Sequence, residues 1–195
     1  MAAHLAEKMG YMSQEEQSQY LDELLALPAK AQKLIDNASQ YAETAKKFYT
    51  HRNAFYIGRN VDDVLAMEAA LKLKEISYVQ CEAYAAGELK HGTLSLVEDG
   101  TLVIAIATQT HLVDKTINNI KECAVRGAYM IAIAMEGDMR LDKEVQEVWE
   151  IPACPEIMAP ALVAIPTQLF GYYMAYEKGC DIDKPRNLAK SVTVE

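Results

Sequence analysis

The stretch Leu102-Val103-Ile104-Ala105-Ile106-Ala107 carries no polar side chain over six successive positions. A continuous apolar run of this length is typical of a strand that is buried on both faces, as the strands of a parallel sheet are. Parallel strands need crossover connections, which are usually helices. Residues 102–107 therefore predict a central strand with helical segments before and after it.

Strand and helix patterns alternate on both sides of this stretch. Val113, Ile117 and Ile120 follow with helical spacing, and Gly127 supplies a helix stop. The expected strands are 53–57, 79–85, 102–107, 129–134 and 148–151, and a further helix is expected at 61–78. The alternation predicts an α/β fold, a three-layer αβα sandwich with a mainly parallel sheet of about five strands.

The first 50 residues have a different pattern. They contain no glycine after Gly10 and a single proline, Pro28. Ser13 and Glu16 have the spacing of a capping box, and a second helix is expected to follow Pro28 and run to about residue 50. The chain is therefore expected to consist of a helical arm at 1–50 and an α/β domain at 51–195.

The composition excludes several classes of protein. The 195 residues carry a net charge of -9, which argues against a nucleic-acid or anionic-membrane surface, because both need a positive field. The four cysteines are too far apart for a zinc knuckle or a CxxC pair, and the N-terminus does not resemble a signal peptide. We expect reduced thiols, a cytoplasmic protein and no bound metal.

Residues 157–176 are uncharged and long enough to cross a bilayer as a helix. Pro160, Pro166 and Gln168 interrupt the apolar character of this segment, and no basic flank fixes an orientation. We expect a helix that is packed in a globular core. The sequence also lacks GxGxxG, Walker and GxSxG motifs, so no nucleotide cofactor and no serine hydrolase site is expected.

Glu68, Lys72 and Glu75 share one face of the expected helix 61–78, at positions i, i+4 and i+7. Two interpretations are open. Charged stripes usually face water, which favours a solvated edge with a weak ion pair. The alternative is a catalytic carboxylate whose protonation is tuned by the neighbouring ammonium.

Two further segments could carry chemistry. His91 lies in the loop Glu88-Leu89-Lys90-His91-Gly92, which follows an expected strand and so lies at the carboxyl edge of the sheet. It is either an ordinary loop histidine or a group that moves protons near neutral pH. Lys190 lies in a polar tail that is typical of a flexible terminus, but a lysine among apolar neighbours can also attack a carbonyl group and form a Schiff base.

Three blocks of the sequence together resemble one family. They are 70–78 (ALKLKEISY), 82–92 (EAYAAGELKHG) and 183–195 (DKPRNLAKSVTVE). They are similar to the second sugar isomerase (SIS) subdomain of the glutamine–fructose-6-phosphate aminotransferase family, from about residue 51 to the end. The ending PRNLAKSVTVE is specific, whereas the ELKHG block is shared more widely among SIS proteins.

The resemblance implies roles for the candidate residues. Glu75 matches the carboxylate that moves a proton between C1 and C2 of the sugar, and Lys190 matches the lysine that forms a Schiff base with open-chain fructose-6-phosphate. His91 matches a histidine that assists ring opening in the neighbouring subunit of a dimer. The substrate contacts implied are Lys72, Glu68 and the Ala189 backbone. No cofactor is implied.

The sequence also departs from the family pattern. Met1-Ala2-Ala3 is not the N-terminal cysteine that hydrolyses glutamine, and the Ser/Thr-rich phosphate loop of the first SIS subdomain is absent. We expect part of an isomerase region whose glutaminase and first SIS domains are missing, and which alone makes no glucosamine-6-phosphate at a useful rate. The alternatives are a stand-alone SIS phosphosugar isomerase or deglycase, and a non-catalytic phosphosugar-binding or dimerisation module.

Overall fold

Five parallel strands form the centre of the protein in a computed structural model that describes residues 1–186. The strand order is β2-β1-β3-β4-β5, and every pair of neighbours is parallel. The strands are β1 (Asn53–Gly58), β2 (Gln80–Ala85), β3 (Leu102–Ala107), β4 (Tyr129–Met135) and β5 (Glu147–Ile151). The parallel five-stranded sheet that the sequence predicted is confirmed, with strand ends that differ by one residue at most.

Strand β3 lies in the middle of the sheet, and all six of its side chains are buried. Because successive side chains point to opposite faces of a strand, Leu102, Ile104 and Ile106 enter one hydrophobic cluster. The alternate residues Val103, Ala105 and Ala107 enter the other cluster. One strand therefore supplies the centre of both layers of the core.

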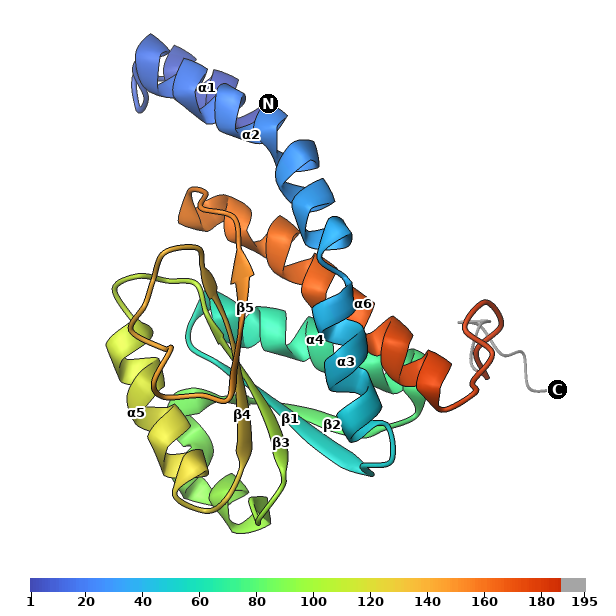
Figure 1. Cartoon of the computed structure of the whole chain (residues 1–195). Coiled ribbons are helices and arrows are strands. Elements are labelled where there is room, and N and C mark those ends of the chain that lie inside the picture. The colour runs from blue at the N-terminus through green and yellow to red at the C-terminus, as the bar shows by residue number, and fades with distance from the viewer. Residues whose placement is uncertain (187–195) are drawn as a thin grey trace, which may run out of the picture.

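Helices cover both faces of the sheet (Figure 1). One layer contains α3 (Ser39–Phe48), α4 (Val61–Ser77) and α6 (Ala159–Glu177), whose buried residues share the cluster of Leu102. The other layer contains α5 (Val113–Ala124) and the short 3₁₀ helices η1 (Ala86–His91) and η2 (Thr93–Leu96). The αβα sandwich is thereby complete.

The N-terminal helices α1 (Ala2–Lys8) and α2 (Gln14–Asp36) project away from the sheet (Figure 1). The capping box is present: the Ser13 Oγ accepts a hydrogen bond from the Glu16 amide at 3.2 Å, and the Ser13 amide donates to Glu16 Oε2 at 2.8 Å. The boundary at residue 50 stays a prediction. Helix α3, which lies before that boundary, packs in the layer that covers the sheet.

The helix boundary expected at Pro28 is wrong. Pro28 lies inside α2, and the helix ends at Asn37, before α3 begins. Proline removes one hydrogen bond within a helix, and burial on either side of it can offset that loss. Leu34 is buried and Leu27 and Ala31 pack against the core, so tertiary contacts hold α2 together through the proline.

The apolar segment 157–176 forms the short η3 (Glu156–Met158) and most of α6, which packs beside α4. Gly171 faces α4 at ordinary contact distance, since a Cβ there would lie 3.5 Å from Ile76 Cδ1. By length and composition Glu156–Glu177 is apolar enough to span a membrane, but half of its apolar window is buried within the fold. Its position matches the core helix expected from the sequence.

Glu147 at the start of β5 joins α3 to the amino edge of the sheet. Its carboxylate accepts hydrogen bonds from Tyr129 Oη and Lys47 Nζ, both at 2.7 Å, and from Thr44 Oγ1 at 2.5 Å. Burial opposes ionisation of Glu147, but the three donors outweigh it and lower the pKa of the carboxyl group. A half-buried charge thus anchors the helix that leads into β1.

Candidate functional site

The charged stripe on α4 forms the ion pairs that its spacing predicts. Lys72 Nζ lies 2.9 Å from Glu75 Oε2 and 3.6 Å from Glu68 Oε1. The hydrogen bond to Glu75 raises the pKa of Lys72, so this ammonium stays protonated between two carboxylates. Lys72 therefore cannot act as a base, but its hydrogen bond can fix the orientation of the Glu75 carboxylate.

The stripe is accessible without being a fully solvated edge. The exposed fractions are 30% for the Lys72 side chain and 38% for Glu75, compared with 55% for Glu68. The neighbouring Ala69, Ala70 and Leu73 are buried in the core. The stripe thus lies at the rim of a packed surface, where a ligand can reach the carboxylate of Glu75.

The C-terminal segment returns to this end of α4. The Arg186 amide donates a 3.0 Å hydrogen bond to the Tyr78 hydroxyl, and the Arg186 guanidinium lies 4.2 Å from the centre of the Tyr78 ring. Tyr78 is the residue directly after α4. The chain is therefore held beside the last turn of the helix that carries Glu75.

Lys190 and Ala189 lie outside the described residues, so their predicted roles stay predictions. Lys190 follows Arg186 by four residues, a span of at most about 14 Å of extended chain. That reach is compatible with the convergence on Glu75 that the sequence implied.

His91 lies at the other edge of the sheet. His91 is the last residue of η1, which follows the carboxyl end of β2. Helix α4 starts at the carboxyl end of β1 and runs back along the sheet, so Glu75, near its end, lies at the amino edge. A six-residue strand spans roughly 20 Å, so one chain does not bring His91 and Glu75 together. The imidazole is largely exposed, and its Nδ1 lies 2.7 Å from Glu88 Oε2.

The carboxyl edge also holds a buried polar network that the sequence did not reveal. Asp62, in the first turn of α4, accepts hydrogen bonds from the Thr108 amide at 2.9 Å and from the Thr108 hydroxyl at 2.6 Å. Gln109 Nε2 donates to the Arg59 carbonyl at 2.7 Å, and Gln109 Oε1 accepts from Asn60 Nδ2 at 3.0 Å. Burial raises the pKa of Asp62, and the bonds from Thr108 partly oppose it.

This network joins the loops that follow β1 and β3, where the direction of the crossovers reverses. Open α/β sheets commonly place ligands at such a switch point. A pocket of about 290 Å³ lies beside it, lined by Gly58, Arg59, Asn60, Ala85, Ala86, Gly87, Glu88, Leu112 and Lys115. The Arg59 guanidinium is fixed by Asn119 Oδ1, with bonds of 3.0 and 2.7 Å. No sequence pattern pointed to this pocket, because its residues come together only through the order of the strands.

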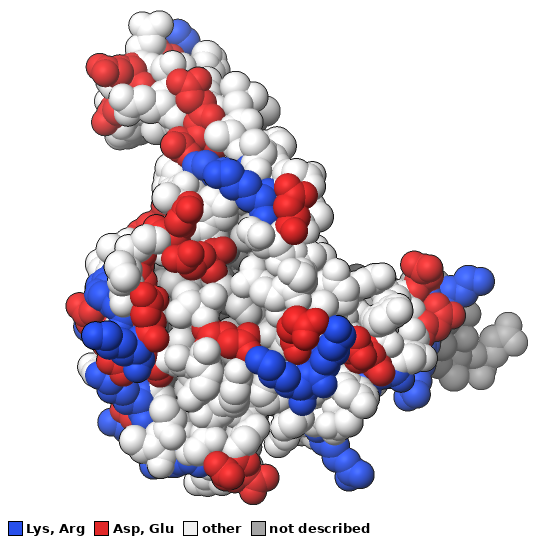
Figure 2. Space-filling model, viewed as in Figure 1, with Lys and Arg blue, Asp and Glu red and all other residues white. Residues whose placement is uncertain are grey.

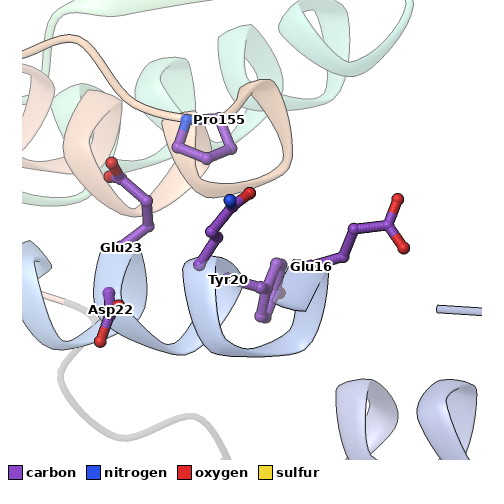
Figure 3. A pocket seen from close by; sticks show the side chains of 6 residues that line it. Glu16, Tyr20, Asp22, Glu23 and Pro155 are labelled. Atoms are coloured by element: carbon purple, nitrogen blue, oxygen red, sulfur yellow. The ribbon is translucent and has the colours of Figure 1, made fainter. Parts of the chain in front are cut away.

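A second hollow of about 510 Å³ lies between α2 and the segment before η3 (Figure 3). Glu16, Asp22 and Glu23 contribute carboxylates to its wall from α2, and Pro155 lies opposite. An anionic sugar phosphate is repelled by such a lining. None of the candidate catalytic or substrate-binding residues lines this hollow.

The charges on the face shown in Figure 2 are mixed, with acidic and basic side chains interleaved over the body of the protein. Within residues 1–186, no group of three His, Cys, Asp or Glu side chains is arranged to hold a metal ion.

The family model of the SIS domain matches residues 47–178, which include the whole sheet and α4, α5 and α6. The chain belongs to the SIS domain family. Its relatives include the glutamine–fructose-6-phosphate aminotransferase [isomerizing] of Clostridium tetani, with 50% identity over 195 residues. That alignment covers 100% of this chain and 32% of the relative, so the chain spans about a third of the length of the curated relatives it matches.

Two solved structures are similar in fold and in sequence. The C-terminal domain of glucosamine-fructose-6-phosphate aminotransferase from Francisella tularensis has a TM-score of 0.85 and 31% identity, covering 93% of this chain and 51% of that chain. Glucosamine-6-phosphate deaminase from Thermotoga maritima has a TM-score of 0.70 and 26% identity, covering 97% and 53%. The chain is homologous to the isomerase region of the aminotransferase.

Proposed function

We propose that this chain binds fructose-6-phosphate and contributes the imine-forming and proton-transfer groups by which a glutamine–fructose-6-phosphate aminotransferase converts it, with ammonia, to glucosamine-6-phosphate. One observation carries the proposal: the end of α4 that holds the Lys72–Glu75 pair is also the place where the segment leading to Lys190 is bound. The 50% identity to the Clostridium tetani enzyme supports it.

The reaction begins with attack of the neutral Lys190 amine on the C2 carbonyl of the open-chain sugar. A carbon–nitrogen bond forms and the carbonyl oxygen leaves as water, which gives an imine. Ammonia then adds to C2 of the imine and the Lys190 amine leaves, so that the sugar carries a C2=NH group and the lysine is free again. The Glu75 carboxylate removes a proton from C1 and returns it to C2, while the C1 hydroxyl gives up its proton and the nitrogen gains one, which leaves an aldehyde at C1 and an amine at C2.

The remaining residues orient these groups. Protonated Lys72 directs the carboxylate of Glu75, because the two side chains form a hydrogen-bonded ion pair. Glu68, on the same face, and the Ala189 backbone contact the sugar.

His91 assists ring opening in the site of a second copy of the chain. Its position at the carboxyl edge, roughly a strand length from Glu75, supports a shared site, since one chain does not unite the two groups. The functional unit is then a homodimer. The partners within a longer protein are a first SIS domain that holds the sugar phosphate and a glutaminase domain that releases ammonia, in the cytoplasm.

Borohydride trapping tests the proposal directly. The chain is incubated with fructose-6-phosphate, reduced, digested and analysed by mass spectrometry. We expect Lys190 to carry an added mass equal to fructose-6-phosphate minus one oxygen atom, and the label to vanish in Lys190→Arg. Labelling that is spread over surface lysines, or equal labelling in Lys190→Arg, contradicts the proposal.

A second candidate is supported by the similarity to the Thermotoga maritima deaminase. In that case the same groups release ammonia from glucosamine-6-phosphate without any need for glutamine. Ammonia release by the chain from glucosamine-6-phosphate, with no synthesis in the presence of a glutaminase domain, favours this candidate. A non-catalytic binding module, by contrast, tolerates both Glu75→Gln and Lys190→Arg.

A further inference from the structure

Tyr78 adopts a backbone conformation that tyrosine rarely occupies. It ends α4 with φ 59° and ψ 21°, in the left-handed region where glycine is strongly favoured after a helix. The chain uses glycine near the ends of the neighbouring helices, with φ 88° at Gly127 after α5 and φ 67° at Gly179 after α6. A bulky residue in this conformation is strained, and such a residue persists where its contacts offset the cost of the strain.

The Tyr78 side chain makes two contacts with Arg186. Its hydroxyl accepts the hydrogen bond from the Arg186 amide, and its ring lies against the Arg186 guanidinium, 108 residues away in the sequence. The segment approaches Tyr78 in a fixed direction, because the Lys184 amide donates a 3.0 Å bond to Asp181 Oδ1 and Pro185 restricts the backbone before Arg186. Glycine at position 78 cannot make either contact with Arg186.

We propose that Tyr78 is a positioning residue, which with Arg186 clamps the C-terminal segment against the end of α4 beside Lys72 and Glu75. The inference rests on the proposed function, in which Lys190 must meet the same sugar as Glu75. Tyr78 follows Glu75 at the third position along the chain, and Lys190 follows Arg186 at the fourth. A clamp at this point limits how far the amine can move from the carboxylate.

Limited trypsin digestion of the whole chain measures the clamp. Trypsin cuts after Arg186 only when the guanidinium and the following bond are free, so release of the segment after Arg186, detected as a chain that ends at Arg186, reports opening of the clamp, and cleavage after Lys190 gives a different product. We compare the wild type with Tyr78→Gly, which removes both contacts, and with Tyr78→Phe, which keeps the ring and loses the hydroxyl. Tyr176→Phe on α6 is the matched control, because Tyr176 is exposed and, within residues 1–186, forms no hydrogen bond or ring contact with Tyr78 or Arg186.

We expect release about tenfold faster in Tyr78→Gly and about fivefold faster in Tyr78→Phe, with no change in Tyr176→Phe. The melting temperature of Tyr78→Gly is expected to equal or exceed that of the wild type, since glycine relieves the left-handed strain. Faster cleavage without lower stability separates a clamp from a merely structural role. Cleavage of both Tyr78 variants at the wild-type rate overturns the clamp.

Borohydride trapping on the same proteins tests positioning. We expect the rate of Lys190 labelling by fructose-6-phosphate to fall about tenfold in Tyr78→Gly, with partial recovery in Tyr78→Phe. If a variant is cleaved faster by trypsin after Arg186 but its uncut chain is labelled at Lys190 at the wild-type rate, the positioning role is overturned. If the wild type itself forms no imine, the proposed function fails, whereas the cleavage rates still decide whether Tyr78 holds the segment.

Discussion

Lys72 and Glu75 lie one helical turn apart on α4, with 2.9 Å between the ammonium nitrogen and a carboxylate oxygen. A similar pair on α3, Lys46 and Glu43, has a separation of 2.8 Å and the same spacing in the sequence. The two pairs differ in their surroundings, because the α4 pair precedes Tyr78, which contacts Arg186, whereas Lys46 lies near Glu177 at the end of α6. This contrast supplies a matched control for the function of Glu75.

Glu75→Gln is expected to abolish proton transfer while leaving imine formation intact. The amide has nearly the shape of the carboxylate but cannot accept a proton, so exchange of the C1 hydrogen with solvent should fall about a hundredfold or more. Exchange is measured by nuclear magnetic resonance in deuterated water. The Glu43→Gln variant should exchange the C1 hydrogen at the wild-type rate. Equal exchange rates in the Glu75→Gln and Glu43→Gln variants would contradict the role of Glu75.

A site shared between two chains predicts complementation. His91→Asn should slow labelling of Lys190 about tenfold or more, because ring opening loses its acid–base group. Mixing with Lys190→Arg chains, which still carry His91, should restore labelling of the His91→Asn chains. Mass spectrometry distinguishes the two chains, and a mixture no more reactive than its components argues for a site within one chain.

Glu147 predicts a specific loss of stability in acid. Its pKa is lowered in the folded protein, so its stabilising contribution is fully present above the ordinary value of about 4.5 and is lost as the pH falls through the lowered pKa. Glu147→Gln should reduce the free energy of unfolding by about 1–3 kcal/mol at pH 7. In urea titrations the difference from the wild type should shrink at pH 3, and a difference that is constant with pH contradicts the assignment.

Asp62→Asn is expected to loosen the junction between β1 and β3. The amide has one acceptor oxygen in place of two, so one of the Thr108 donors loses its partner in a buried site. The expected cost is about 1–3 kcal/mol in the free energy of unfolding. Denaturant titration measures it, and the Thr108 amide should exchange faster with solvent in the variant.

Gly58→Ala tests how tightly the first turn of α4 follows β1. A Cβ at position 58 would lie 2.3 Å from the carbonyl carbon and oxygen of Asp62, so the helix start must shift. We expect a loss of about 2–4 kcal/mol in unfolding free energy. Gly171→Ala in α6 is the control, because its Cβ meets Ile76 at 3.5 Å and alanine favours a helix, so its stability should be equal or higher.

Sequence patterns alone were enough for the elements that bury a regular surface. The apolar run 102–107, the helical spacing after Val113 and the capping box at Ser13 each reflect contacts over a few residues, and each appears in the structure as expected. The helix boundary predicted at Pro28 was wrong, because the contacts that stabilise α2 on both sides of the proline come from distant parts of the chain.

The arrangement of the candidate site was decided at the tertiary level. Sequence motifs named Glu75 and His91, but the strand order and the direction of α4 place them at opposite edges of the sheet. The contact of Tyr78 with Arg186 and the network of Asp62 with Thr108 join segments 108 and 46 residues apart. Local spacing reveals which face of an element is buried, whereas the pairing of distant segments depends on how all the layers pack at once, and no short pattern encodes that.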